Sequence, residues 1–281
     1  MLTQKEVITS KQNPTVKRIS ALSDKKGRRA EGLFRFDGIK LFGEAIASGL
    51  DIKYVVLCDK ADKIIVSAVE KTVSDGALSE SKILLVGESV FEKLSEQKAP
   101  DGIITVAKFI GERHQDIPAS EIGNYSVATG ERILIAESLR DPGNLGTVIR
   151  SCAALGIDRL IISDDCADLY NPKTIRGAMG GLFRLRTDTV ALEDMPALIG
   201  ALRASGRRIF AAALHTEALT IGQLKLKASD CFVIGNEGHG LSDSTVNACD
   251  ACAIIPMIEG SESLNAAAAA AICIWETVRA E

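Results

Sequence analysis

Hydrophobic and polar positions follow two rhythms along this chain. Short apolar runs that stop at glycine or polar residues are typical of buried β-strands, and apolar residues recurring every three or four positions are typical of helices. Over residues 8–106 the two rhythms alternate, with strands predicted at LFRFDG, YVVLC, ILLVG and IITVAKF and helices between them. The pattern therefore predicts an α/β unit of about a hundred residues, an ordinary domain size.

The alternation resumes after a polar stretch, residues 108–131, that contains Pro118 and three glycines and has no sustained periodicity. We interpret this stretch as a linker. Beyond it, ILIAE, the helix LGTVIRSCAALG and RLIIS form a βαβ unit, which implies parallel strands. The sequence thus predicts a first domain over residues 1–107, a linker over 108–131 and a second domain over 132–281.

Two strands predicted in the second domain lead directly into loops of small and polar residues. CFVIG runs into NEGHG, and ACAIIP runs into MIEGSESLN, after which a C-terminal helix begins. Ser261 or Ser263 is expected to cap that helix, as Asn144 is expected to cap the helix after DPGN. Strands that end in such loops are typical of ligand sites in α/β proteins. For either loop alone, an ordinary strand-to-helix turn is an equal alternative.

Several other ligand-binding signatures are missing from the sequence. There is no Walker loop and no GxGxxG after the first strand, which counts against NTP hydrolysis and dinucleotide binding. Cys249 and Cys252 form a CxxC pair, but no second pair or histidine follows at zinc spacing. No metal site is predicted, and a thiol or zinc module is a minor alternative. We interpret His215 and His239 as loop residues.

Composition and charge narrow the class of protein. Hydrophobic residues make up 46% of the 281 residues and charged residues 25%, which is typical of a soluble globular protein. The N-terminus lacks the apolar core of a signal peptide and no apolar run reaches about 18 residues, so we expect a cytoplasmic protein without a membrane partner. Seven cysteines in apolar segments are expected to be reduced.

The net charge of −4 is unevenly distributed. Residues 1–40 carry ten Lys or Arg against four Asp or Glu, so a basic N-terminal region precedes an acidic remainder. Such a region is a plausible footprint for a polyanion, although a merely solvated surface is the commoner explanation.

Three segments of the second domain resemble a known family. ESLRDPGNLGTVIRSCAALGI (137–157), VIGNEGHGLS (233–242) and IIPMIEGSESLNAAAAAAI (254–272) are similar, in order and spacing, to the signature motifs of the SpoU/TrmH RNA 2′-O-ribose methyltransferases of the SPOUT superfamily. NPKTIRGAMGGLFRL is similar to a further family stretch. ITSKQNPTVKRISAL and FRFDGIKLFGEAI resemble the small substrate-binding domain of the ribosomal-RNA branch. The resemblance covers essentially the whole chain.

The resemblance implies an α/β protein in which a trefoil-knotted SPOUT methyltransferase domain follows a smaller α/β domain of the ribosomal protein L30e type. It implies S-adenosyl-L-methionine as the cofactor and a homodimer formed through the C-terminal domain. The expected reaction is methylation of a ribose 2′-hydroxyl in structured RNA, with 23S ribosomal RNA preferred. Transfer RNA as substrate, or a catalytically silent RNA-binding ribosome-assembly factor, are the alternatives.

The resemblance also assigns roles to individual residues. The family view makes Arg150 the base, but a guanidinium has a pKa above about 12 and rarely loses its proton, so we interpret it as a phosphate clamp. The expected catalytic residues are Asn144, Arg150, Glu237, Ser263 and Asn265. The expected cofactor-binding residues are Leu214, Gly235, Asn236, Ile255, Met257 and Leu264. The expected RNA-binding residues are Lys11, Lys17, Arg18, Lys173 and Arg176.

Overall fold

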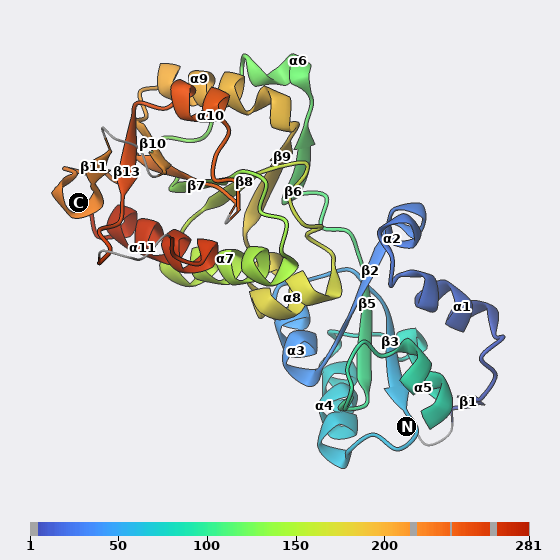
Figure 1. Ribbon diagram of the computed structural model, residues 1–281. Helices are drawn as coiled ribbons and strands as arrows, with labels where there is room; N and C mark the ends of the chain where they lie inside the picture. The colour runs from blue at the N-terminus through green and yellow to red at the C-terminus, as the bar shows by residue number, and fades with distance from the viewer. Residues whose placement is uncertain (1–4, 214–217, 237, 259–262, 281) are drawn as a thin grey trace. The chain divides into compact units, whose positions relative to one another are not determined.

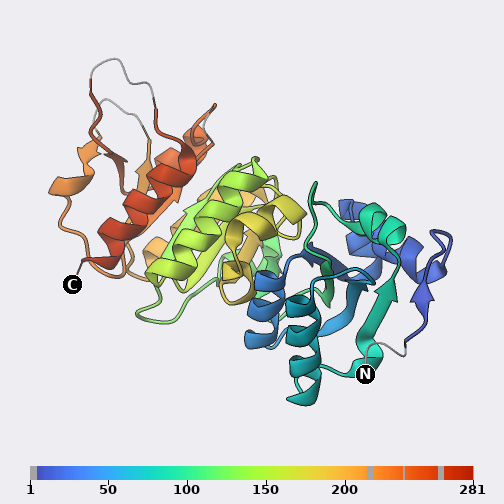
Figure 2. The ribbon, with the colours of Figure 1, turned by 90° about the horizontal axis from the view of Figure 1, so that it is seen from below.

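The computed structural model describes residues 5–213, 218–236, 238–258 and 263–280, and the chain divides into two compact units (Figures 1 and 2). The first unit comprises residues 1–110 and 170–176, and the second comprises residues 111–169 and 177–281. Each unit contains one β-sheet, as expected from the two runs of alternating strands and helices.

The first unit is built on a five-stranded sheet in the order β1-β4-β3-β5-β2. β5 pairs antiparallel with both β2 and β3, whereas β4 pairs parallel with β3 and β1. All four strands predicted in this half are present. The elements are β1 (Val7–Ile8), α1 (Pro14–Ala21), α2 (Lys25–Glu31), β2 (Leu33–Asp37), α3 (Ile39–Ala47), β3 (Ile52–Cys58), α4 (Lys63–Ser74), β4 (Ile83–Val86), α5 (Glu88–Leu94) and β5 (Ile103–Lys108).

Residues 170–176 belong to the first unit, and an aromatic cluster joins Tyr170 to other residues of that unit. The ring of Tyr170 stacks on Phe109 with centroids 4.3 Å apart and lies 4.7 Å from Phe34, a residue of β2. The Tyr170 hydroxyl also accepts a hydrogen bond of 2.8 Å from the backbone N–H of Ile110. Stacked aromatic pairs of this kind contribute about 0.5–1.5 kcal/mol beyond the area they bury.

The second unit is built on an eight-stranded sheet in the order β11-β13-β10-β12-β7-β8-β9-β6. Every pair of neighbouring strands is parallel, which confirms the predicted βαβ unit of β7, α7 and β8. The elements that lie wholly in this unit are β6 (His114–Ile117), α6 (Ala119–Ile122), β7 (Ile133–Ala136), α7 (Pro142–Leu155), β8 (Arg159–Ser163), β9 (Arg186–Val190), α9 (Met195–Ala204), β10 (Ile209–Ala212), β11 (Leu219–Thr220), β12 (Cys231–Ile234), α10 (Asp243–Ala248), β13 (Ala251–Ile254) and α11 (Ala266–Val278). The helix α8 (Pro172–Ala178) begins in the first unit and ends in the second.

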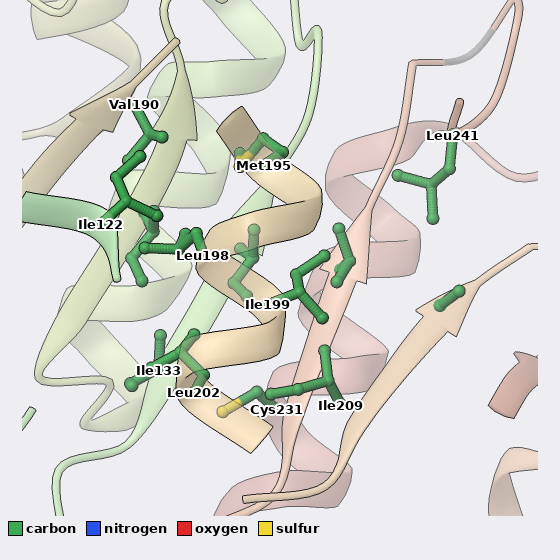
Figure 3. Packing of buried hydrophobic residues seen from close by; sticks show 14 of the residues in the cluster. Ile122, Ile133, Val190, Met195, Leu198, Ile199, Leu202, Ile209, Cys231 and Leu241 are labelled. Atoms are coloured by element: carbon green, nitrogen blue, oxygen red, sulfur yellow. The ribbon is translucent and has the colours of Figure 1, made fainter. Parts of the chain in front are cut away.

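Helices cover both faces of this sheet (Figure 1). α7 and α11 pack side by side on one face, and α9 and α10 lie on the other. The buried residues of α9 are Met195, Leu198, Ile199 and Leu202, whose spacing forms one helical stripe. They pack against apolar strand residues such as Ile133 (Figure 3). Burying an apolar side chain of this size contributes about 1.5–3 kcal/mol.

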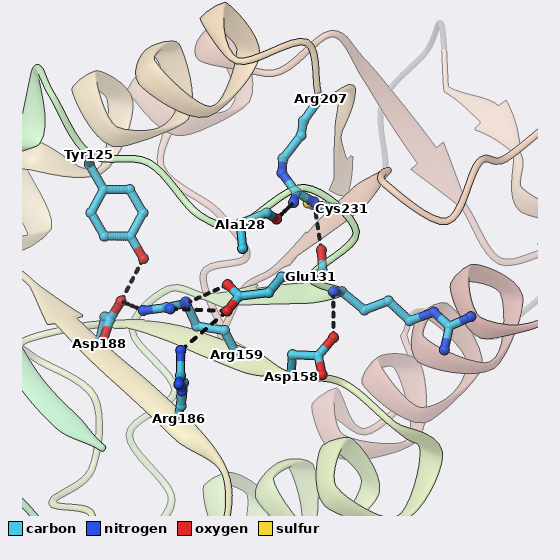
Figure 4. Close-up of polar contacts among 10 residues, drawn as sticks. Tyr125, Ala128, Glu131, Asp158, Arg159, Arg186, Asp188, Arg207 and Cys231 are labelled. Carbon is cyan, nitrogen blue, oxygen red and sulfur yellow. Dashed lines mark hydrogen bonds and ion pairs between the residues drawn. The ribbon is translucent and has the colours of Figure 1, made fainter. Parts of the chain in front are cut away.

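Part of the stretch predicted to be a linker is regular structure. β6 and α6 lie within residues 108–131, and β6 pairs with β9 at the edge of the second sheet. The rest of the stretch is tied to the sheet by polar contacts (Figure 4). The Tyr125 hydroxyl donates to Asp188 (2.5 Å), which also accepts from Arg159 (2.6 Å), and Arg207 donates to the backbone carbonyls of Ala128 and Glu131.

Two predicted helix caps are wrong. Asp141, not Asn144, caps α7, because its carboxylate accepts the N–H of Asn144 (2.8 Å) while Pro142 occupies the first helical position. Asn265, not Ser263, caps α11; Ser261 lies outside the described residues. None of the helices in the described ranges is long and apolar enough to cross a membrane.

Candidate active site

The candidate site lies where four adjacent parallel strands end. β13, β10, β12 and β7 are neighbours in the sheet, so their carboxyl ends lie along one edge. The loops that leave β7, β12 and β13 contain the three motif segments found in the sequence. The loop after β10 contains Leu214, which lies outside the described residues together with Glu237.

Gly235 ends β12 at a point where the chain folds back on itself. The backbones of Asn236 and Gly240 exchange two hydrogen bonds, of 3.1 and 2.9 Å, and close a tight loop. A Cβ atom at residue 235 would lie 2.5 Å from the carbonyl carbon of Gly240 and 2.7 Å from the nitrogen of Leu241. Because backbone atoms cannot tolerate such a contact, only glycine allows this loop to close.

Side-chain contacts join this loop to the one after β7. The Asn236 amide donates to the backbone carbonyl of Ser138 (2.9 Å) and accepts from the N–H of Gly238 (2.8 Å). The carboxylate of Glu137 is buried and accepts from the N–H of Ser242 (2.7 Å) and from the hydroxyl of Thr245. The sequence analysis assigned no role to Glu137, although this acidic residue ends an apolar strand and begins the first motif segment.

Asn144 and Asn265 are brought together although 121 residues separate them in the sequence. Asn265 Nδ2 donates to Asn144 Oδ1 over 3.0 Å. Asn265 Oδ1 accepts from the N–H groups of Ala267 and Ala268, at 3.0 and 3.2 Å, and so caps α11. One side chain therefore links the starts of α7 and α11, which come from the first and third motif segments.

Arg150 lies on α7 and its side chain is exposed. Within the part of the chain that the structure describes, the Arg150 side chain forms no ion pair or hydrogen bond. Glycines let the next segment approach the helix closely at this point. A Cβ at residue 181 would lie 3.2 Å from the Ile149 carbonyl oxygen and 3.0 Å from Ala153 Cβ.

The loop after β13 carries several apolar side chains of its own. Ile255 and Met257 are half-buried, Leu264 is 37% exposed and Ile258 is 82% exposed. Ser263 is exposed beside Asn265. Sites for small molecules are usually lined by apolar side chains and a few polar groups. Exposed apolar side chains beside the backbone groups of a loop therefore suit a ligand that has both an aromatic ring and polar groups. S-adenosylmethionine is a ligand of that kind.

The predicted RNA-binding residues are all exposed, but they differ in their contacts. Arg18 donates to Glu31, with Nη2 to Oε2 at 2.5 Å, so its charge is already partly neutralised. Lys11 lies just before α1 and Lys17 lies on it, whereas Lys173 and Arg176 lie on α8.

Two arginines of the basic N-terminal region are buried instead of facing solvent. Arg28 donates to the carbonyls of Leu22 and Ser23, and Arg35 pairs with Glu96 at 2.6 Å. They stabilise the first unit and are not available to bind a polyanion.

The CxxC pair does not have the properties of a reactive thiol site. All seven cysteines are unpaired, and burial raises the pKa of Cys249 to about 12. Reactive thiols need a lowered pKa and exposure. Among the residues described, no group of three or more His, Cys, Asp or Glu side chains is placed to hold a metal ion.

Both units are similar to known protein families. The SpoU rRNA Methylase family matches residues 131–275, which is more than half of the 281 residues. The MRM3-like substrate binding domain matches residues 13–105. The two matches therefore fall on the two halves in which the sequence predicts separate domains.

Individual relatives are similar over 70% to 98% of the chain. The 23S rRNA (guanosine(2553)-2′-O)-methyltransferase RlmP of Bacillus subtilis is 29% identical over 268 residues, covering 95% of this chain and 97% of that protein. The 23S rRNA (uridine(2479)-2′-O)-methyltransferase of Streptomyces viridochromogenes is 29% identical over 200 residues, or 70% of this chain and 67% of that protein. The AdoMet-bound rRNA methyltransferase of Sinorhizobium meliloti superposes with a TM-score of 0.79 at 28% identity, covering 98% and 97% of the two chains.

Proposed function

This chain belongs to the SpoU rRNA Methylase family, and from that membership we propose that it methylates a ribose 2′-hydroxyl of 23S ribosomal RNA. It is an S-adenosylmethionine-dependent RNA methyltransferase of the SPOUT fold. The observation that carries the proposed site is the hydrogen bond between Asn265 and Asn144, because it places polar residues of two signature motifs side by side.

S-adenosylmethionine supplies a sulfonium methyl group to the reaction. We assign its binding to the backbone around Gly235, Ile255 and Leu264, with Leu214, Asn236 and Met257 beside them. The half-buried apolar side chains of Ile255 and Met257 support this assignment, because they offer an apolar wall at the end of β13.

Methyl transfer requires the ribose oxygen to be in line with the carbon it attacks, and the hydroxyl proton must leave. In the proposed arrangement Arg150 binds an RNA phosphate and orients the ribose, since its exposed guanidinium has no ion-pair partner in the described ranges. Asn144 and Asn265 hold the hydroxyl, with Ser263 next to them. Glu237 is assigned the orientation of its loop.

We assign RNA binding to the first unit. The exposed Lys11 and Lys17 lie with Lys25, Lys26 and Arg29 on or next to α1 and α2, two helices that contact each other. A cluster of cations on adjacent helices attracts phosphates and releases their counterions on binding. Lys173 and Arg176 would add contacts from α8.

We further propose that the protein is a homodimer formed through α11. Ala268, Ile272 and Trp275 follow the spacing of one helical face, and Trp275 is 55% exposed. An exposed tryptophan on an apolar helix face is typical of an interface. Trp275→Glu should convert a dimer into a monomer in analytical ultracentrifugation, and a wild-type protein that sediments as a monomer would contradict the assignment. The ribosomal substrate and seven unpaired thiols favour a cytoplasmic location.

The test of the function is transfer of a labelled methyl group from S-adenosylmethionine to purified RNA. We expect label in 23S ribosomal RNA, with mass spectrometry placing it on one ribose, and none in transfer RNA. Arg150→Lys keeps the positive charge but not the planar fork, so turnover should fall about 10- to 100-fold with unchanged cofactor affinity.

Three results would each overturn part of the proposal. Labelling of transfer RNA alone would replace the substrate. Calorimetry that detects no cofactor binding would favour a silent RNA-binding factor. An Arg150→Lys enzyme with normal turnover and RNA affinity would remove the phosphate clamp.

A further inference from the structure

The loop after β7 is held in place by the last residue of β8 and by residues that follow it. Ser163 is fully buried, and its Oγ accepts the backbone N–H of Ser138 over 2.7 Å. The Sγ of Cys166 accepts the N–H of Leu139 over 3.2 Å, and the N–H of Ala167 donates to the carbonyl of Leu139 over 3.0 Å. Three backbone groups of this loop, the N–H of Ser138 and the N–H and carbonyl of Leu139, are therefore held by residues at the end of β8.

Asp165 is the polar centre of this arrangement. Its Oδ2 accepts from the Ser138 hydroxyl (2.7 Å) and from Arg140 (2.9 Å), and its Oδ1 accepts from the Ser163 hydroxyl (2.7 Å). Burial alone would raise the pKa of Asp165, but the hydrogen bonds from Ser163, Arg140 and Ser138 outweigh it and lower the pKa. The carboxylate is thus charged and fully engaged at neutral pH.

Ser138 has a backbone conformation that it would not adopt by itself. Its φ is +55°, in the left-handed region that residues with a side chain rarely occupy. Such a conformation persists only when the surroundings enforce it. Here the N–H of Ser138 is held by Ser163 and its hydroxyl by Asp165.

The conformation of Ser138 has a direct effect on the candidate site. Its carbonyl accepts the amide of Asn236, in the loop after β12. Three residues further along, Asp141 begins α7, which carries Asn144 and Arg150. A rotation of the Ser138 peptide would therefore move two parts of the site. It would displace the carbonyl that binds Asn236, and it would shift the start of α7, which carries Asn144 and Arg150.

We propose that Asp165 is a positioning residue for methyl transfer, which acts by holding Ser138 in its left-handed conformation. The inference rests on the proposed function, because it concerns the same site. It adds a residue that lies outside all three signature motifs and touches neither Asn144 nor Asn236 directly.

Asp165→Ala is the principal test, with calorimetric binding of S-adenosylmethionine, the kcat and KM for 23S ribosomal RNA, and the melting temperature as readouts. We expect the cofactor dissociation constant to rise, and kcat to fall, about tenfold each, because Ser138 relaxes to negative φ. Asp165→Asn keeps the size of the side chain and should fall between wild type and Asp165→Ala. Should Asp165→Ala fail to fold, Asp165→Asn supplies the same comparison.

A second substitution separates positioning from stability. Ser138→Gly makes the left-handed conformation intrinsically accessible, so Asp165→Ala/Ser138→Gly should recover much of the lost affinity and kcat. If the role of Asp165 were purely structural, cofactor affinity and kcat would instead follow the melting temperature from variant to variant, because glycine at positive φ also changes stability. The matched control is Asp164→Ala, which removes the neighbouring carboxylate whose Oδ1 accepts the N–H of Leu192 (3.1 Å).

Two outcomes contradict the proposal. One is an Asp165→Ala protein that matches Asp164→Ala in cofactor affinity and kcat. The other is a loss in Asp165→Ala that tracks the melting temperature and is not restored by Ser138→Gly. If the wild-type protein bound the cofactor but methylated no RNA, the proposed function would fail, and the affinity comparison would still decide the role of Asp165.

Discussion

Asn265 uses the two ends of its side-chain amide for different purposes. Its oxygen caps α11 and its nitrogen donates to Asn144. Aspartate at residue 265 keeps the capping oxygen but removes the donor, whereas alanine removes both. The two substitutions therefore separate helix stability from the geometry of the site.

We predict that Asn265→Asp keeps nearly the wild-type melting temperature, because aspartate is as good a cap as asparagine. Methyl transfer should fall about tenfold, since the contact with Asn144 Oδ1 loses its donor. Asn265→Ala should lose the same activity and in addition about 1 kcal/mol of stability. Thermal unfolding and single-turnover methylation measure the two effects. An active Asn265→Asp enzyme would mean that the contact with Asn144 has no catalytic role.

At the level of single residues, the sequence predicted candidate site residues but not their local contacts. The resemblance singled out Asn144 and Asn265, yet no spacing could show that residues 121 positions apart share a hydrogen bond. Capping was assigned to Asn144 because asparagine favours that position, but the aspartate directly before Pro142 is better placed. The sequence could not indicate the roles of Ser138 and Asp165, because these arise from a backbone angle and from a contact with a neighbouring strand.

Among the elements, the tight loop after β12 depends most directly on a single residue. Gly235→Ala places a Cβ within 2.7 Å of backbone atoms of Gly240 and Leu241. We predict a loss of about 1–3 kcal/mol in the free energy of unfolding, together with weaker cofactor binding, because the loop must open. Urea unfolding, monitored by Trp275 fluorescence, measures the free energy of unfolding. Calorimetry with S-adenosylmethionine measures the cofactor affinity.

Gly200→Ala is the matched control for this substitution. Gly200 is exposed inside α9, and a Cβ there would meet nothing within 4 Å. Alanine should raise the free energy of unfolding by about 0.5–1 kcal/mol, because glycine is a poor helix former. Equal effects at residues 200 and 235 would show that the contact with Gly240 has no energetic importance.

The elements of the fold could be predicted wherever their residues are apolar and periodic. β6 was missed because His114, Gln115 and Asp116 are polar, as an edge strand allows. The pairing of β7 with β8 follows from a short βαβ connection. The position of β10 between β12 and β13 could not be predicted in this way, because it depends on packing between segments that are distant in the sequence.

For the whole molecule, stability should depend on pH through His114 of the second unit. Its Nε2 lies 3.1 Å from the Leu182 carbonyl oxygen, and burial lowers its pKa from 6.5 to about 4. As the pH falls below about 6.5, His114 becomes protonated in the unfolded chain, whereas in the folded protein it stays neutral until about pH 4. Stability is therefore fully present above pH 6.5 and is lost between pH 6.5 and 4, by about 3 kcal/mol at most.

Trp275 is the single tryptophan of the chain and belongs to the second unit, so its fluorescence reports on the unfolding that His114 affects. Urea titrations at pH 7, 6 and 5 should show that the free energy of unfolding of the wild type falls with pH. In His114→Gln the free energy of unfolding should depend less on pH. Identical pH dependence in the two proteins would assign the effect to other groups.

RNA binding is a property of the whole molecule, and its dependence on salt counts the phosphates that the protein neutralises. Lys11→Ala and Lys17→Ala should each reduce the slope of log K against log salt by about 0.7–0.9, because each exposed ammonium is proposed to contact one phosphate. Arg18→Ala should reduce the slope less, since Glu31 already neutralises that guanidinium. Lys71→Ala, an exposed cation on α4, is the control with an unchanged slope. Equal slopes for all four variants would mean that these helices do not contact the RNA and that the basic N-terminal region is only solvated surface.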